Sequence, residues 1–352
     1  MKNPETIYGI EILRFISALA ILIYHYQHFY LFEDQEFVIE NQPFYIFLKF
    51  FYFYGFQGVN FFWCISGFIF FWKYSEIIKV MNSFQFFKIR FARLYPLHLL
   101  TLIFVIILQY FYFLETDQVF LDLKNDLYHF FLQIFMASYW GFEVGHSFNS
   151  PIWSISIEIL VYIFFYILLK NFGASSLINF IIIAICIILK AIYEHNAHVF
   201  FDCLLFFFLG GTIALNIKHI KNLKLVKIFI SLTVLLALFF TFKFDLYLLN
   251  NFTYCFQLLL YPLLLIFFLN LKFNNKNLNN LLSVFGNLTY SSYLLHLPIQ
   301  ILIGLIFIKL GETVPTNEKI FFIFYILFVL TISYFSFRYF ENPVRKYLRK
   351  GI

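Results

Sequence analysis

Long apolar runs, separated by short polar segments, repeat along most of the chain. A helix needs about 20 mostly apolar residues to cross the hydrocarbon core of a bilayer. Ten runs approach or exceed this length, at residues 8–29, 44–72, 95–114, 152–169, 177–193, 199–216, 226–242, 253–271, 287–308 and 320–340. The second is long enough to be tilted or broken, and Gly55, Gly58 and Gly67 offer places for a break. The pattern predicts an all-α, polytopic membrane protein with about ten transmembrane helices.

An eleventh segment, residues 127–140, is short and contains His129 and Gln133. Whether it crosses the membrane decides the side on which every later loop lies. Cytoplasmic loops carry an excess of Lys and Arg, so the loop charges can settle the question.

If 127–140 stays at the surface and the N-terminus is cytoplasmic, most basic residues fall in the inner loops and most acidic residues in the outer loops. The inner loops and tail then hold Lys73, Lys79, Lys88, Arg90, Arg93, Lys170, Lys218, Lys221, Lys224, Lys227, Lys272, Lys276, Arg338, Arg345, Lys346, Arg349 and Lys350. The outer loops hold Glu33, Asp34, Glu36, Glu40, Glu115, Asp117, Asp122, Asp126 and Glu143, with Lys124 as a rare cation. A crossing at 127–140 places the 218–227 lysines and the tail outside. We therefore predict ten spans, cytoplasmic N- and C-termini, and a long outer loop at 115–151 that holds a surface amphipathic segment.

Composition supports a membrane protein and limits the other classes. Of 352 residues, 62% are hydrophobic and 12% are charged, whereas soluble domains average about 25% charged residues. No Pro/Gly/Ser linker or repeat is visible, so we expect one transmembrane domain over 1–352 without a fused soluble domain. None of the four cysteines forms a C-x-x-C pair, and we expect neither a metal site nor a disulfide framework. The net charge of +6 mostly reflects orientation, and we expect no nucleic-acid partner.

The first apolar run carries ionisable residues, which are costly inside a membrane and are candidates for function. Arg14 and His25 are eleven residues apart, so they project from one helix face, ~16 Å apart along the axis. The alternative is an intrahelical pair between Glu11 and Arg14 beside a histidine that serves packing.

Arg90 and Arg93 form a second candidate, at the cytoplasmic mouth of the third span. Guanidinium groups bind phosphate through two parallel hydrogen bonds and stay charged. Orientation in the membrane alone also places basic residues here, and both interpretations remain open.

The third candidate is the segment Asn149-Ser150-Pro151-Ile152-Trp153-Ser154-Ile155-Ser156-Ile157-Glu158. Pro151 suits the first turn of a helix, and that helix carries Glu158 into the membrane about one turn from the outer surface. A carboxylate there indicates a partner for a buried histidine or for a cation. His25 and Glu158 are expected at similar depth, which is the pairing a general base needs.

These segments together resemble the acyltransferase 3 family, whose members acylate surface polysaccharides, lipopolysaccharide O-antigens and related sugars with cytoplasmic acyl-CoA. The resemblance runs from Tyr8 to about Arg345. Arg14 and His25 match the opening motif of Arg, ten residues, then His. The other matching segments are Phe61-Phe62-Trp63-Cys64-Ile65-Ser66-Gly67-Phe68, Arg90-Phe91-Ala92-Arg93, Trp153-Ser154-Ile155-Ser156-Ile157-Glu158, Ser292-Tyr293-Leu294-Leu295-His296 and Glu341-Asn342-Pro343.

The resemblance implies a membrane O-acetyltransferase of a cell-surface glycan or its lipid-linked precursor, located in a bacterial cytoplasmic (inner) membrane. Arg90 and Arg93 would hold the phosphates of acetyl-CoA, a co-substrate rather than a bound cofactor, and Arg14 would line its path. His25 would act as general base, oriented by Glu158. The expected acceptor contacts are Asn149, Trp153, Ser154, Tyr293 and His296. The expected partners are the acceptor, membrane lipids and a separate periplasmic or extracellular protein.

Two other classes remain open at this point. A transporter or flippase for a lipid-linked glycan also buries Arg, His and Glu along its pathway, although inverted repeats are not visible here. A non-catalytic assembly subunit would have no use for His25. Within the enzyme hypothesis, a covalent acetyl-histidine and direct transfer are equally permitted.

The loop charges generate a topology prediction. In a cysteine-free variant, single cysteines at Asp34, Asp122 and Glu143 should react with an impermeant maleimide added outside intact cells. Cysteines at Lys79, Lys221 and Lys350 should react only after the cells are permeabilised. Labelling of position 221 from outside would support eleven spans and reverse the second half of the topology.

Overall fold

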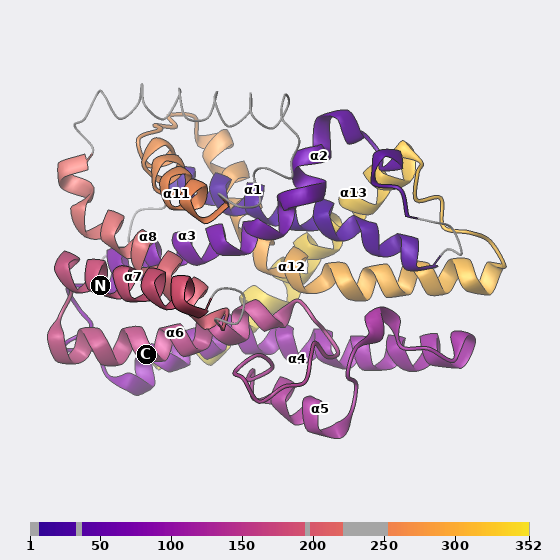
Figure 1. The fold of residues 1–352 in the computed structure, drawn as a ribbon, viewed down its shortest axis with the longest axis horizontal. Helices are drawn as coiled ribbons and strands as arrows, with labels where there is room; N and C mark the ends of the chain where they lie inside the picture. Colours follow the sequence, from indigo (N-terminus) through magenta and orange to yellow (C-terminus); the bar gives the residue numbers. More distant parts are fainter. Residues whose placement is uncertain (1–6, 33–36, 194–197, 221–252, 352) are drawn as a thin grey trace. The chain divides into compact units, whose positions relative to one another are not determined.

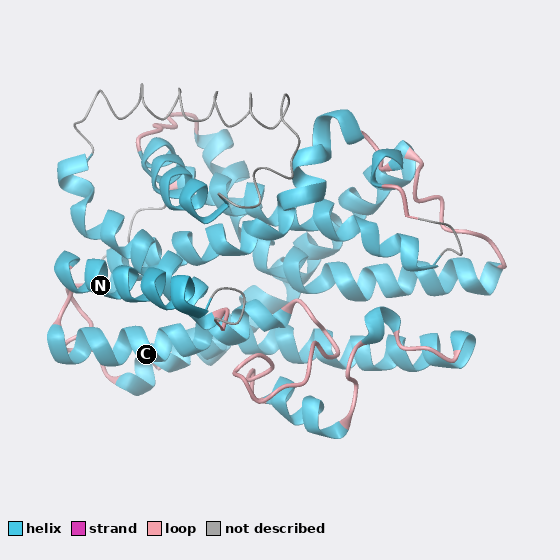
Figure 2. Ribbon diagram, in the orientation of Figure 1, coloured by secondary structure: helices cyan, strands magenta, loops and turns pink. Residues whose placement is uncertain are grey.

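The computed structural model describes residues 7–32, 37–193, 198–220 and 253–351, and these ranges contain helices and loops but no β-strand (Figure 2). Within them, eight helical segments are long and apolar enough to cross a membrane. The chain is therefore an all-α polytopic membrane protein, as the apolar runs predicted.

The helices follow the chain in the order shown in Figure 1. The α-helices are α1 (Tyr8–His25), α2 (Tyr45–Tyr54), α3 (Gly58–Tyr74), α4 (Ser83–Thr116), α5 (Leu127–Ile134), α6 (Ile152–Phe172), α7 (Ser176–Tyr193), α8 (Phe200–Ile220), α11 (Thr253–Leu269), α12 (Lys276–Leu310), α13 (Lys319–Ser336) and α14 (Asn342–Leu348). Short 3₁₀ segments are η1 (Tyr26–Phe32), η2 (Ile39–Asn41), η3 (Gly55–Gln57) and η4 (Phe120–Asp122), and a π-helical turn, η6 (Phe337–Glu341), joins α13 to α14.

Eight of the ten predicted spans coincide with these membrane-length segments. The second is broken into α2 and α3 by η3, which begins at the predicted glycine Gly55 and is followed by the predicted glycine Gly58, whereas Gly67 lies inside an unbroken α3. The predicted span 253–271 forms α11, a shorter helix. The predicted span 226–242 lies outside the described residues.

Two helices extend well beyond the apolar runs that predicted them. The run 95–114 lies within α4, which begins at Ser83, and the run 287–308 lies within α12, which begins at Lys276. The Asn82 side chain caps α4 by accepting a hydrogen bond from the Phe84 N–H at 2.9 Å. Hydropathy marks only the part of a helix that lipid surrounds, so it missed these polar ends.

The segment 127–140 does not form a membrane-length helix. It contains α5, which has eight residues and a length of ~12 Å, far less than a bilayer core of ~30 Å. Its Asp126 cap accepts hydrogen bonds from the backbone N–H and the ring Nδ1 of His129, each at 2.8 Å. These bonds hold the pKa of Asp126 below its usual range. The finding supports the placement of this segment in a loop.

The described helices group into two compact units, and α1, α6 and α12 each contribute residues to both. The first unit comprises Met1–Ser17, Val59–Val80 and Val161–Gly286, and the second comprises Ala18–Gly58, Met81–Leu160 and Asn287–Ile352.

Glycines allow α3 and α8 of the first unit to pack backbone against backbone. A Cβ added at Gly67 would collide with the Phe207 carbonyl, and one added at Gly210 would collide with the Cys64 carbonyl. Small residues serve this purpose in membrane proteins, because lipid supplies no hydrophobic force between helices and close contact must replace it.

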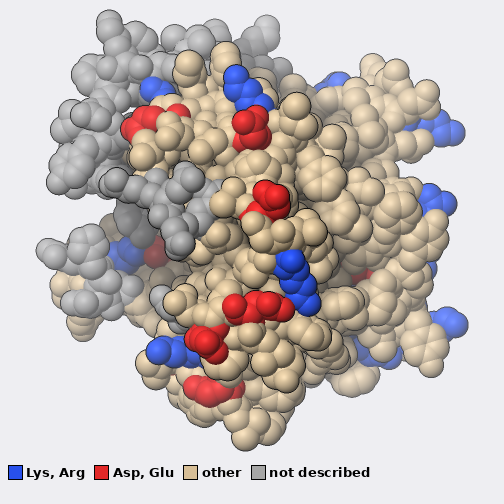
Figure 3. Space-filling model, turned by 90° about the vertical axis from the view of Figure 1, so that its right-hand side faces the viewer, with Lys and Arg blue, Asp and Glu red and all other residues tan. Residues whose placement is uncertain are grey.

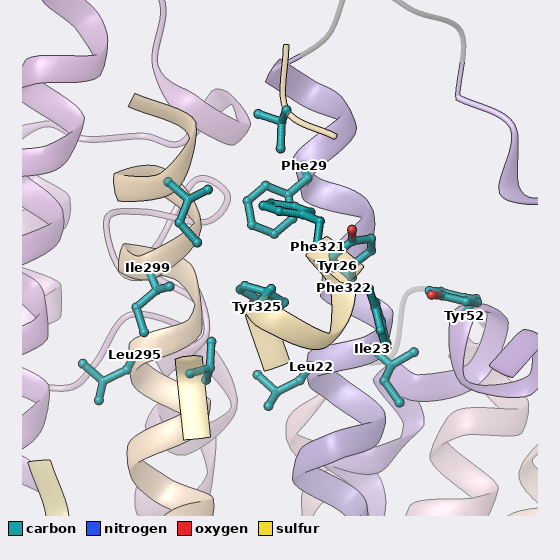
Figure 4. Close-up of a cluster of buried hydrophobic side chains, with 13 residues drawn as sticks. Leu22, Ile23, Tyr26, Phe29, Tyr52, Leu295, Ile299, Phe321, Phe322 and Tyr325 are labelled. Atoms are coloured by element: carbon teal, nitrogen blue, oxygen red, sulfur yellow. The ribbon is translucent and has the colours of Figure 1, made fainter. Parts of the chain in front are cut away.

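The second unit contains an aromatic core around Tyr26, Phe29 and Tyr325. Figure 4 shows these rings gathered between the α1–η1 segment and α13. The Phe29 and Tyr325 rings meet edge to face with centroids 5.0 Å apart. The Tyr26 hydroxyl donates to the Thr316 carbonyl at 2.8 Å. This core fixes the C-terminal end of α1, where His25 lies.

The loops at one end of the second unit carry most of its acidic side chains. Figure 3 looks onto this end, where acidic groups are visible among mostly uncharged surface. The exposed members are Glu40, Glu115, Asp117, Asp126, Glu312 and Glu318. All of them come from loops that the predicted ten-span topology places on one side of the membrane.

Candidate active site

One face of α12 carries a row of polar side chains through the second unit. Tyr290, Tyr293, His296 and Gln300 are three or four residues apart, so they lie above one another along the helix. His296 and Gln300 have no exposed surface, and Tyr293 is buried. We call these four residues the α12 polar column. Buried polar groups are costly unless they are hydrogen-bonded. The hydrogen-bond partners of these four side chains therefore show which residues the column positions.

His25 contacts the column through its ring. Its Nδ1 lies 2.8 Å from His296 Nε2. The other ring nitrogen of His296, Nδ1, lies 2.7 Å from the Tyr293 carbonyl, one turn earlier in α12. The hydrogen bonds therefore form a chain from a backbone carbonyl through His296 to His25.

This chain fixes the proton positions of both rings. A carbonyl oxygen can only accept, so His296 Nδ1 must carry hydrogen and donate to Tyr293. In neutral His296 the Nε2 atom is then an acceptor, and His25 Nδ1 must be the donor. Neutral His25 consequently has its lone pair on Nε2, the nitrogen on the opposite side of the ring. Within the described part of the chain, no hydrogen bond occupies that atom.

The His25 ring lies between two other imidazoles. It stacks on His296 with centroids 4.9 Å apart and on His28 with centroids 4.8 Å apart. His28 Nδ1 is 3.3 Å from Gln300 Oε1, and Gln300 Nε2 donates to the His25 carbonyl at 2.7 Å. Gln300 thus ties the end of α1 to α12 and supports the stack. The His25 ring is fixed in both tautomer and orientation, which is what a general base requires.

Glu158 does not hold His25, contrary to expectation. Its carboxylate interacts electrostatically with Tyr290 and Tyr293, which precede His296 by six and three residues in α12. Along a helix these intervals correspond to ~9 Å and ~5 Å. The sequence placed His25 and Glu158 at similar depth, whereas these intervals place Glu158 nearer the start of α12, and His296 is the residue hydrogen-bonded to His25. A role of Glu158 toward the imidazolium remains a prediction.

Ser154 and Tyr293, which were both expected to contact the acceptor, are hydrogen-bonded to each other. Their hydroxyl groups lie 2.7 Å apart, and both residues are buried. Trp153, the neighbour of Ser154, is half-buried at the start of α6. One turn deeper in the column, the Tyr290 hydroxyl donates to the Leu94 carbonyl at 2.5 Å and joins α12 to α4.

Asn149 has a structural role that the motif did not reveal. Pro298 has no N–H, so the Leu294 carbonyl loses its normal partner within α12. Asn149 Nδ2 donates to that carbonyl at 3.2 Å and also to Thr101 Oγ1 of α4 at 2.9 Å. Asn149 is completely buried, and its expected contact with the acceptor remains a prediction. Asn149 repairs the proline break and links α4 to α12.

The loop that contains α5 is anchored to α4. His98 Nε2 donates to the Gln133 carbonyl at 2.8 Å, and the Gln133 amide donates to the Ser147 carbonyl at 2.7 Å. The Val144 N–H donates to His129 Nε2 at 3.1 Å. His129 and Gln133, which seemed too polar for a span, are buried as loop anchors. They hold residues 144–147 of this loop in place.

The opposite end of the second unit carries arginines. Arg90 is buried and Arg93 is half-buried. Arg349 of the tail donates to the Ile89 carbonyl at 3.1 Å, which brings a third guanidinium to the same end of α4. Glu341 accepts a hydrogen bond from Ser291 and interacts electrostatically with Arg93 and Arg345. The sequence had explained the tail arginines by membrane orientation alone, because their approach to α4 depends on the fold.

Arg14 lies in the first unit and forms an ion pair with Glu11, with Nη1 and Oε2 2.7 Å apart. The intrahelical pair considered for α1 is therefore present. The Glu11 carboxylate also lies against Gly286 of α12, where a Cβ would collide with it. This contact gives Glu11 a packing role, whereas a role of Arg14 toward the donor remains a prediction.

Comparison with known proteins identifies the class of reaction that the chain catalyses. Residues 7–338 match the family model described as an acyltransferase domain. The chain belongs to the acyltransferase 3 family. No curated protein and no solved structure matches the chain. Membership indicates a membrane acyltransferase, and it covers every residue of the α12 polar column as well as His25.

The candidate site contains two histidines that the sequence did not connect. His296 was expected only as an acceptor contact, because 271 residues separate it from His25. His28 received no role at all. Its spacing of three residues from His25 was a usable signal, since residues three apart on a helix lie on neighbouring positions.

The hydrogen-bond chain predicts how His296 contributes to acyl transfer. His296→Leu removes the acceptor for His25 Nδ1–H and should reduce kcat roughly 10- to 100-fold, the usual cost of losing an orienting partner. His296→Gln keeps an acceptor oxygen and should recover part of that loss. Acyl transfer by purified protein, normalised to its amount in the membrane, measures the effect. A Leu variant with wild-type kcat would contradict the orienting role.

Proposed function

We propose that this acyltransferase moves an acetyl group from acetyl-CoA to a hydroxyl of a cell-surface glycan or its lipid-linked precursor in a bacterial cytoplasmic membrane. The observation that carries the proposal is the lone pair on His25 Nε2, held by the chain through His296. A neutral imidazole whose lone pair is held in a fixed direction is suited to accept a proton from a hydroxyl.

The two ends of the second unit suit the two substrates. The phosphates of acetyl-CoA would bind Arg90 and Arg93, with Arg345 and Arg349 adding positive charge. From Arg90 to Leu94 is ~6 Å along α4, and from Tyr290, which contacts Leu94, to His296 is ~9 Å along α12. The extended pantetheine arm of CoA can span that ~15 Å and bring the thioester to His25. Arg14 is retained as a family-derived contact of the donor.

The proposed chemistry is general-base acyl transfer. His25 Nε2 removes the proton of the acceptor hydroxyl while that oxygen attacks the thioester carbonyl. The C–S bond breaks as the new C–O bond forms, and the CoA thiolate takes the proton from the imidazolium. His296 keeps accepting from His25 Nδ1–H throughout, as the third group of a catalytic triad does. Attack by His25 Nε2 itself, giving an acetyl-imidazole, uses the same lone pair.

Arg90 and Arg93 generate a prediction about the donor. Replacing both with Ala should weaken acetyl-CoA binding by ~1.5–3 kcal/mol per lost charge-assisted hydrogen bond. Replacement with Lys should recover only part, because Lys keeps the charge but not the planar fork. Calorimetric binding to purified protein measures the change. Arg338→Ala is the matched control, because Arg338 is exposed and lies against Tyr334 and Tyr339. Unchanged affinity in the double Ala variant would exclude the proposed donor site.

His25 generates the decisive prediction. His25→Gln keeps hydrogen-bonding capacity but has no basic nitrogen, so it should bind acetyl-CoA normally and transfer acetyl ~10²–10⁴-fold more slowly. A complete loss of turnover would favour the acetyl-imidazole. Mass spectrometry of the cell-surface glycan, beside protein abundance in the membrane, provides the measurement. His198→Gln, in a loop of the first unit, is the control and should retain activity. Normal acetylation by His25→Gln would mean that another group is the base.

A further inference from the structure

Three aromatic rings gather where the outer loop meets the start of α6. Tyr139 stacks on His146 with centroids 5.3 Å apart and an interplanar angle of 21°. Trp153 closes the group, with its centroid 5.5 Å from Tyr139 and 6.2 Å from His146. His146 is exposed, and the other two rings are half-buried. The rings thus contact one another while leaving surface available to a ligand.

The backbone beneath these rings is held in place. The Tyr139 N–H donates to Ser156 Oγ at 3.0 Å, and the Trp140 indole N–H donates to the Ser156 carbonyl at 2.8 Å. The Lys124 N–H donates to the His146 carbonyl at 2.9 Å. Ser156 is completely buried in α6. A binding surface fixed before the ligand arrives loses little entropy on binding.

These rings lie close to the candidate base. His146 is among the groups that interact electrostatically with His25, together with His28 and His296. An aromatic belt residue at a membrane surface faces the lipid. The Tyr139 and His146 rings instead stack on each other, and Trp153 packs against both at an angle. Ser154, the neighbour of Trp153, is hydrogen-bonded to Tyr293 of the α12 polar column.

The chemistry of the rings indicates a sugar. One face of a pyranose presents several C–H groups, which pack against the electron-rich face of an aromatic ring, while its hydroxyls project from the edge. A hydroxyl at that edge would then face His25 Nε2. Hydroxylated acceptors without a ring, such as glycerol, have no comparable flat face.

We propose that Tyr139, His146 and Trp153 form a stacking platform for a pyranose ring of the acceptor, with the acylated hydroxyl directed toward His25. This inference rests on the proposed function and narrows its acceptor to a cyclic sugar. Trp153 was an expected acceptor contact, and the structure adds Tyr139 and His146, which belong to none of the motifs.

Binding can be tested without turnover. Protein in lipid nanodiscs is mixed with methyl pyranosides of glucose, galactose, rhamnose and N-acetylglucosamine, and saturation-transfer NMR detects contact with their ring C–H protons. At least one pyranoside should show transfer, and glycerol should not. His146→Ala and Tyr139→Leu should each weaken it, whereas His146→Phe keeps an aromatic face and should retain it. Phe142→Ala, an exposed aromatic residue elsewhere on the same loop, is the matched control and should not change it.

Kinetics separate the platform from the acyl-transfer proposal. With a pyranoside that is acetylated, His146→Ala should raise the acceptor KM about 3- to 10-fold, as expected for one lost ring contact, with the KM for acetyl-CoA unchanged. Transfer signals equal in the wild type and both variants would overturn the platform and leave the rings as a membrane-interface anchor. A platform-dependent signal with no acetylation of any pyranoside would support the platform while the proposed acetyl transfer fails.

Discussion

The hydrogen bond from His25 to His296 is the interaction on which the site depends. A buried polar group is costly unless it is hydrogen-bonded, so the partners of the two rings decide where their protons lie. The Tyr293 carbonyl provides the first partner, because it fixes the proton of His296 on Nδ1. His296 Nε2 must then accept the hydrogen bond from His25 Nδ1, so the lone pair of neutral His25 lies on Nε2. One backbone carbonyl thus determines which nitrogen of His25 can act as a base.

The rest of the second unit keeps this hydrogen-bond chain in position. The aromatic core around Tyr26 and Tyr325 fixes the end of α1, and Gln300 joins that end to α12. Pro298 interrupts the backbone hydrogen bonding of α12 within one turn of His296. Asn149 repairs the interruption and also binds α4. A loop residue therefore stabilises a break that would otherwise leave a carbonyl without a partner inside the membrane.

Charge and aromatic character are distributed along the second unit in the way that two different substrates require. Arginines gather at one end, where an anionic nucleotide would bind, and aromatic rings gather at the other, beside His25. The α12 polar column runs between them. In the proposed function, a donor and an acceptor would approach one imidazole from opposite sides of a membrane, so neither would have to cross it completely. The outer loop contributes to the acceptor end because His98 and Gln133 hold it down on α4.

The sequence by itself determined the helical class, eight of the described spans, the break at Gly55–Gly58 and the family. These features depend on hydrophobic length, local backbone freedom and short motifs, all of which are local properties of the chain. It also selected His25, because an ionisable residue within an apolar run is conspicuous. Only the tertiary structure decided that His296 rather than Glu158 orients His25, that Asn149 repairs the proline break, and that Arg349 joins the basic end of α4. Those contacts join residues up to 271 positions apart, and their geometry follows from how deeply each helix sits and which face it turns inward.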